Sequence, residues 1–92
     1  MKIHGLDKGI RRYVEILVSN GIETYESCEG GRGHAYPEPT IRFYGEIAEG
    51  FRALAIAIEN GLPVDEIRRF WSVQDLQPVG PDWAITFSEK AK

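Results

Sequence analysis

The fold is decided by the stretch Ile10-Arg-Arg-Tyr-Val-Glu-Ile-Leu-Val-Ser-Asn-Gly21 and by its continuation, Ile22-Glu-Thr-Tyr-Glu-Ser-Cys28. Four apolar side chains of the first part share one face of a helix: Ile10, Tyr13, Val14 and Leu17. Asp7 precedes them as the expected N-cap, and Asn20-Gly21 ends the helix because glycine tolerates the left-handed backbone found there. The continuation is short and rich in β-favouring residues, so the whole stretch predicts a helix followed by a strand.

The remaining sequence predicts the same kinds of element again. A second helix is expected over residues 46–60, also ending in Asn-Gly, with its buried stripe formed by Phe51, Leu54, Ala55 and Ile58. Strands are expected over residues 40–44, 67–73 and 83–87, with a turn over residues 77–82. Residues 29–39 are expected to form a loop, because two prolines in three positions do not fit inside a paired strand.

These elements follow the order αββ-αββ. Each half offers one apolar helix face and one apolar strand face, and burying all of them favours an α+β, two-layer sandwich. We therefore expect a single domain over residues 1–92, with a four-stranded, mainly antiparallel sheet and two helices on one face. The halves, 7–45 and 46–88, are interpreted as a pseudo-repeat, with chance similarity as the alternative.

Composition narrows the classes of function. The chain has 92 residues, with eleven Lys and Arg against fourteen Asp and Glu, and a formal net charge of −3. This acidic balance argues against nucleic acid as a partner, because affinity for DNA depends on neutralising phosphates. The single cysteine excludes an internal disulfide and a zinc site of four cysteines, or of two cysteines and two histidines.

Nothing in the sequence predicts an association with a membrane. There is no run of roughly 18–20 apolar residues that would span one. The first residues, Met-Lys-Ile-His-Gly-Leu-Asp, lack the apolar region of a signal peptide. We therefore expect a cytoplasmic protein in which Cys28 is a free thiol.

The most suggestive segment is the glycine-rich loop Cys28-Glu-Gly-Gly-Arg-Gly-His34. Its backbone N–H groups are suited to a concave anion site, to which Arg32 adds a bidentate positive charge and His34 a polar contact. We therefore expect a non-enzymatic binding protein that holds a nucleotide or another phosphate-bearing metabolite, with an ordinary hairpin loop as the alternative. Two tyrosines are expected to stack on a ring of this ligand. The expected ligand-binding residues are Cys28, Glu29, Gly30, Gly31, Arg32, Gly33, His34, Tyr36, Arg42 and Tyr44.

The segment Gly21-Ile-Glu-Thr-Tyr-Glu-Ser-Cys-Glu-Gly-Gly-Arg-Gly-His34 resembles a pattern of small, functionally uncharacterised bacterial and phage proteins. In that pattern a helix leads through Gly-Ile to a strand ending in Ser-Cys, then to a Gly-His loop and a further strand. Many of those proteins have Ser-Cys-x-Gly-His, whereas His34 comes three residues later in this chain. The resemblance covers residues 10–45 and implies a bacterial or phage cytoplasmic setting, without implying an activity.

Cys28 and His34 also suggest a Cys–His pair, in which the imidazole takes the proton of a thiol nucleophile. No Asn or Asp partner stands at a telling spacing, and the nearby Glu26 and Glu29 disfavour the thiolate. A Cys28-dependent enzyme is therefore the third hypothesis, and no catalytic residue is assigned. Cys28, His34, His4 and Glu26 or Glu29 are suitable kinds of metal ligand, but Cys-x5-His is no zinc signature, so we expect neither a metal nor a cofactor.

The sheet face opposite the helices is expected to be open. Alternation places Arg42, Tyr44 and Thr86 on it, together with either Arg68 and Phe70 or Arg69 and Trp71. Interleaved aromatic and arginine residues suit a protein–protein surface, so a module that binds a phage or bacterial partner protein is the second hypothesis. Homodimerisation through this face or a sheet edge is a further expectation, and a solvated face whose arginine stems cover the rings is the alternative.

Overall fold

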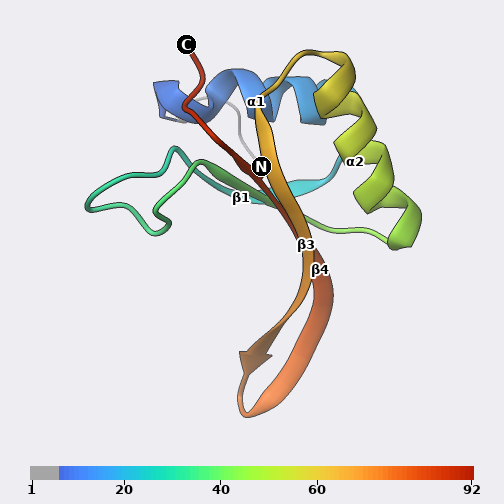
Figure 1. Cartoon of the computed structure of the whole chain (residues 1–92). Helices are drawn as coiled ribbons and strands as arrows, with labels where there is room; N and C mark the ends of the chain where they lie inside the picture. The colour runs from blue at the N-terminus through green and yellow to red at the C-terminus, as the bar shows by residue number, and fades with distance from the viewer. Residues whose placement is uncertain (1–6) are drawn as a thin grey trace.

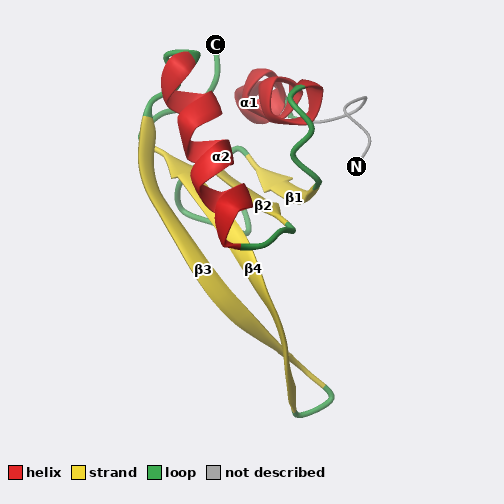
Figure 2. Cartoon of the chain, turned by 90° about the vertical axis from the view of Figure 1, so that its right-hand side faces the viewer, coloured by secondary structure: helices red, strands yellow, loops and turns green. Residues whose placement is uncertain are grey.

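The computed structural model describes residues 7–92. Its elements are α1 (Lys8–Ser19), β1 (Thr24–Cys28), β2 (Thr40–Phe43), α2 (Ile47–Glu59), β3 (Val64–Gln74) and β4 (Gln77–Phe87) (Figure 1). Neighbouring strands are antiparallel, in the order β1-β2-β4-β3 across the sheet. Figure 2 shows both helices on the same side of the sheet, so the predicted α+β architecture is confirmed. Within residues 7–92 neither helix is long and apolar enough to cross a membrane.

Helix α1 packs on the sheet through the predicted stripe. All four residues of that stripe are buried: Ile10, Tyr13, Val14 and Leu17. The ring of Tyr13 lies against that of Phe87, with 4.3 Å between their centroids. Asp7 occupies the N-cap position, as predicted, but its side chain makes no capping hydrogen bond. The carboxylate of Glu29 accepts from the N–H of Gly9 instead (3.2 Å), so a free backbone donor of the helix is satisfied from the loop after β1.

The buried stripe predicted for helix α2 is wrong. Phe51 and Ile58 are 64% and 61% exposed, and Ala55 is also exposed. The residues buried against the rest of the protein are Gly50, Ala53, Ile56 and Ala57. The reason is close packing, because a Cβ on Gly50 would lie 2.5 Å from two carbons of the Trp83 ring. The helix is apolar on both sides, and the side with small residues is buried because it permits the closer approach to the sheet.

The turn predicted over residues 77–82 is also wrong. Those residues belong to β4, and the hairpin turns at Asp75 and Leu76, which both have positive φ (50° and 64°). Pro78 and Pro81 are tolerated because β2 pairs only with residues 83–86 of β4, so the earlier part of β4 has β3 as its one neighbour. The two-stranded ribbon over residues 71–81 projects beyond the rest of the sheet, and we call it the arm (Figure 2). Elsewhere β1 and β2 are slightly shorter than predicted and β3 is longer.

Candidate functional site

The sequence offered two sets of side chains for the sheet face opposite the helices, Arg68 with Phe70 or Arg69 with Trp71. The structure places the set containing Arg68 on this open face. Ala84 of β4 separates Arg68 of β3 from Arg42 of β2 in one row across the strands. Arg69 lies on the helix side, where its guanidinium covers the ring of Trp83 at 5.2 Å from the centroid. The open face therefore presents two arginines with a small residue between them.

A pocket of about 180 Å³ lies on this face. Its floor includes Ala84 and Thr86, whose short side chains stand between the longer ones of β2 and β3. Tyr36 and Glu38 reach it from the loop between β1 and β2. The full lining is Tyr36, Glu38, Thr40, Arg42, Arg68, Phe70, Ala84 and Thr86. The pocket therefore joins residues from three strands and the loop that covers them.

The guanidinium of Arg42 is held between two aromatic rings of this pocket. It lies 5.0 Å from the ring centroid of Tyr36 and 4.5 Å from that of Phe70. Its Nε atom is buried and has no hydrogen-bond partner among residues 7–92. Such stacking fixes the planar group in place, so its N–H donors are already oriented for an acceptor.

Glu26 faces Arg42 across the β1–β2 pair but does not neutralise it. No ion pair joins the two side chains in the described part of the chain, because Glu26 accepts a hydrogen bond from the hydroxyl of Tyr36 instead. Burial, followed by this bond to Glu26, raises the pKa of Tyr36 to about 12. The hydroxyl therefore remains a donor at neutral pH and keeps the Glu26 carboxylate engaged.

The loop that brings Tyr36 over the open face is closed by its own backbone. Gly31 donates its N–H to the carbonyl of Pro37 at 2.9 Å. Gly30 has a φ of 82°, and a Cβ there would lie 2.5 Å from the nitrogen of Pro39. The path of the loop therefore explains the presence of these two glycines without any ligand.

Tyr44, which was predicted as a ligand residue, does not line the pocket. Its ring stacks on that of Tyr25 at 4.4 Å, and the hydroxyl of Tyr25 donates to Asp82 at 3.2 Å. The irregular register between Thr24 and Glu26 brings two successive side chains of β1 to the open face. Burial, then the charge of Asp82, raises the pKa of Tyr25 to about 12. Tyr25 therefore stays neutral at physiological pH, and the stacked pair adds aromatic surface to this face.

The loop over residues 28–34 is organised around the carboxylate of Glu29. Glu29 accepts from Lys90 and from the N–H of Gly9, both at 3.2 Å, and the imidazole of His34 stands 3.7 Å away. These contacts hold the pKa of Glu29 below its ordinary value, with the bond to Lys90 as the largest cause. A carboxylate in this position opposes the binding of an anion by the loop.

Cys28 and His34 do not form a nucleophile–base pair in the structure. Cys28 is buried, and its Sγ accepts from the N–H of Gly30 at 3.4 Å. Within residues 7–92 no hydrogen bond joins the thiol to His34, whose imidazole faces Glu29. Arg32 and Gly33 are exposed. The loop therefore lacks the contact that thiol activation by a histidine requires.

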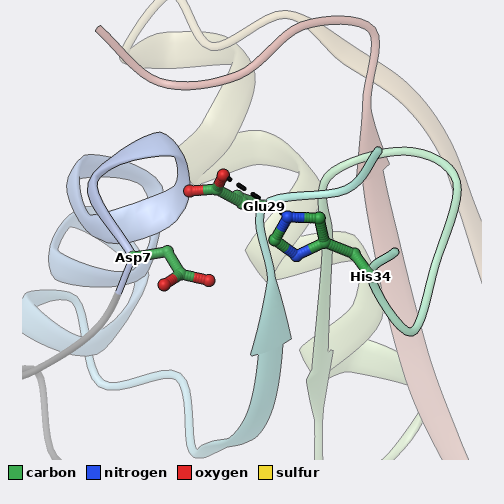
Figure 3. A group of neighbouring side chains, drawn as sticks. All are labelled: Asp7, Glu29 and His34. Carbon is green, nitrogen blue, oxygen red and sulfur yellow. Dashed lines mark ion pairs between the residues drawn. The ribbon is translucent and has the colours of Figure 1, made fainter. Parts of the chain in front are cut away.

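Asp7, Glu29 and His34 place three ligand atoms within 4.8 Å of one another (Figure 3). This group differs from the metal ligands suggested by the sequence, because it does not include Cys28, and His4 lies outside the described residues. Lys90 already brings a positive charge to Glu29. The group is therefore a surface cluster whose central carboxylate already has an ammonium as its partner.

The pocket unites two of the ligand residues predicted from the sequence, Tyr36 and Arg42. Glu38, Thr40 and Ala84 were missed, although alternation along the strands could have placed the last two on the open face. Comparison of the chain with protein-family models, with curated proteins and with solved structures finds no match.

Proposed function

We propose that this protein is a non-enzymatic binding module that holds an anionic small molecule in the pocket on its open sheet face. The observation that supports the proposal best is the Arg42 guanidinium, which is stacked against two rings and whose buried Nε has no partner within the described part of the chain. A buried donor without an acceptor costs about 1–3 kcal/mol. An oxyanion that accepts from Arg42 would recover this cost and gain a charge-assisted bond.

The other residues of the pocket narrow the chemistry of the ligand. Arg68 adds a second positive charge, although Glu66 pairs with it. Glu38 adds a carboxylate, so the best ligand joins an oxyanion to an O–H or N–H donor. Phosphate-bearing metabolites with hydroxyl groups, including nucleotides, have both.

The size of the pocket limits how much of the ligand is enclosed. Its volume is about 180 Å³, whereas pockets that enclose a whole drug-sized ligand have roughly 300–1,000 Å³. The pocket therefore takes the anionic end of the ligand and leaves the remainder at the surface. We place this module in the cytoplasm, a setting supported by its free thiol at Cys28.

Isothermal titration calorimetry with inorganic phosphate, ribose 5-phosphate and adenosine monophosphate tests the proposal. Arg42→Met keeps the length of the side chain and removes the guanidinium, so it is expected to lower affinity by about tenfold or more. Arg32→Met is the matched control, because it removes the same charge from an exposed position of the glycine-rich loop. This control is expected to bind as the unmodified chain does.

The opposite pattern would move the site to the loop. If Arg32→Met weakens binding and Arg42→Met does not, the glycine-rich loop is the anion site and the pocket is not. If none of the three probes binds the unmodified chain, the proposal for phosphate-bearing ligands fails. Thermal unfolding followed by circular dichroism shows whether each variant retains its fold, so a loss of binding is not confused with a loss of structure.

A role in protein–protein contact is the second candidate function. The observation that favours it is the exposure of large apolar side chains on α2 and on the arm. The sequence predicted the interaction surface on the sheet face opposite the helices. Most of the exposed apolar side chains lie instead on α2 and on the helix side of the arm.

A further inference from the structure

Helix α2 presents a continuous apolar stripe to the solvent. The stripe follows helical spacing along one side and consists of Ile47, Phe51, Leu54 and Ile58. Three of these side chains, Ile47, Phe51 and Ile58, are 59%, 64% and 61% exposed. A helix that buries small residues on one side and exposes large apolar ones on the other has an outer side suited to further packing.

The arm presents a second apolar surface. Trp71 is 60% exposed, Val73 72% and Leu76, at the tip, 97%. Leu76 also has a φ of 64°, a conformation that a large side chain adopts at a cost and that glycine or asparagine would adopt more easily. A bulky apolar residue at this exposed and strained position buries almost no surface against the described part of the chain.

The apolar surface of the arm faces the same side of the sheet as the helices. Arg69 lies on that side, over the ring of Trp83. The pairing of β3 with β4 is irregular between Phe70 and Ser72, where two steps along β3 oppose three steps along β4. The extra residue therefore belongs to β4, and side chains along β3 continue to alternate between the two faces. Trp71 and Val73 therefore point to the helix side as Arg69 does. Figure 2 shows that the arm continues past the end of α2, where neither α1 nor α2 covers it.

We propose that two copies of this chain form a symmetric dimer in which the arm of each copy lies over α2 of the other. The stripe from Ile47 to Ile58 is about 16 Å long at the rise of an α-helix. The strand part of the arm surface, from Trp71 to Gln74, is about 10 Å long at the rise of a strand, and Leu76 extends this surface at the turn. A two-fold axis lets each copy use both surfaces at once, which closes the assembly at two copies.

The exposed apolar area agrees with the requirement of a stable dimer. Each large apolar side chain at this level of exposure presents on the order of 100 Å². With the neighbouring parts of α2 and of the arm, the two surfaces approach the roughly 800 Å² per partner of a standard interface. A second copy supplies both complementary surfaces at once, and for this reason it is the occupant that we propose. The pocket lies on the opposite face of the sheet, so this proposal does not depend on the proposed ligand.

Analytical ultracentrifugation of the full chain tests the dimer. The unmodified chain is expected to sediment with twice the mass of the 10.4 kDa monomer. Phe51→Lys alters only the surface of α2, and Val73→Glu alters only the arm. Each variant alone is expected to weaken dimerisation by about 100-fold or more, because its change occurs in both contacts of the dimer.

Mixing the two variants provides the decisive measurement. In a mixed dimer, the unmodified arm of one copy meets the unmodified α2 of the other, and the two introduced charges, of opposite sign, meet at the second contact. Dimers are therefore expected to return on mixing. Because unfolded variants could not restore a dimer, this result also shows that both are folded. Glu15→Lys changes the charge of an exposed position on α1 and is expected to dimerise normally.

Three results would overturn the proposal. A monomeric unmodified chain would mean that these surfaces bind something other than a second copy. A dimer that survives both single changes would use a different surface. Variants that are monomeric alone and remain so when mixed would show that the arm and α2 do not contact each other across the dimer.

Discussion

Gly50→Ala is expected to destabilise the protein, although alanine favours a helix more than glycine does. Helix propensity alone would add about 1 kcal/mol of stability. In the structure, however, the new Cβ would lie 2.5 Å from two carbons of the Trp83 ring. The ring has little freedom to retreat, because its Nε1 donates to the carbonyls of Gly45 and Glu46 at 2.9 and 3.2 Å.

The expected magnitude follows from these opposing effects. Overpacking of a core costs about 1–3 kcal/mol, and the rigid ring places this site near the upper end. Loosening the indole hydrogen bonds costs about 1 kcal/mol more. After subtraction of the helix-propensity gain, the net loss is about 2–3 kcal/mol. For a domain of this size, that corresponds to a fall in the melting temperature of about 8–24 °C.

Thermal unfolding followed by circular dichroism measures this loss, and Ala55→Gly on the same helix is its matched control. Ala55 is exposed, so the control reports helix propensity alone and is expected to cost about 1 kcal/mol. Helix propensity alone predicts that Gly50→Ala stabilises the protein and Ala55→Gly destabilises it. The packing of α2 on Trp83 predicts that both changes destabilise it. A Gly50→Ala variant that melts at or above the temperature of the unmodified chain would refute the reasoning.

Two further predictions concern Glu29 and Tyr36. Lys90 and the N–H of Gly9 lower the pKa of Glu29 from 4.5, so the stability it contributes is present above pH 4.5 and is lost as the pH falls through the lower folded value. Glu29→Gln is therefore expected to be less stable than the unmodified chain in urea at pH 7 and to lose less stability between pH 5 and pH 3; equal pH dependence of the two would contradict this. Tyr36→Phe keeps the ring over Arg42 but removes the hydroxyl that donates to Glu26. The freed Glu26 carboxylate then competes with the ligand for Arg42. Its affinity for inorganic phosphate in calorimetry is expected to fall, and unchanged affinity would count against the role assigned to this hydroxyl.

The parts of the fold with one apolar face could be predicted from the sequence. Helix α1 has a single apolar side, and all of its predicted stripe is buried. Helix α2 is apolar on two sides, so periodicity alone does not choose between them, and the larger side chains suggested the wrong one. The better indicator was the line of small residues, Gly50, Ala53 and Ala57, because close packing on a sheet needs them.

The hairpin and the pocket show a similar limit. Pro78 and Pro81 predict a turn, because proline does not fit a strand that is paired on both sides. This part of β4 pairs only with β3, so it accommodates both prolines. The true turn at Asp75-Leu76 contains no glycine and thus gives no sequence signal. In the candidate site, alternation correctly grouped Arg42 and Thr86 on the open face, because strand periodicity is local. It left open whether Arg68 or Arg69 joins them, and the pairing of β3 with β4 decides for Arg68. The path of the loop that brings Tyr36 to them depends on tertiary contacts, which composition does not describe.

Two adjacent residues of β4 connect the two proposed surfaces. Trp83 points to the helix side, where its ring requires a glycine in α2 and thereby turns the large apolar side chains of that helix outward. Ala84 points to the open side, where its small size leaves a hollow between Arg42 and Arg68. Because successive residues of a strand alternate between its faces, one short segment determines both the outward stripe and the pocket. The pocket and the proposed dimer surfaces lie on opposite sides of the sheet, so a ligand in the pocket would leave the proposed dimer contacts free.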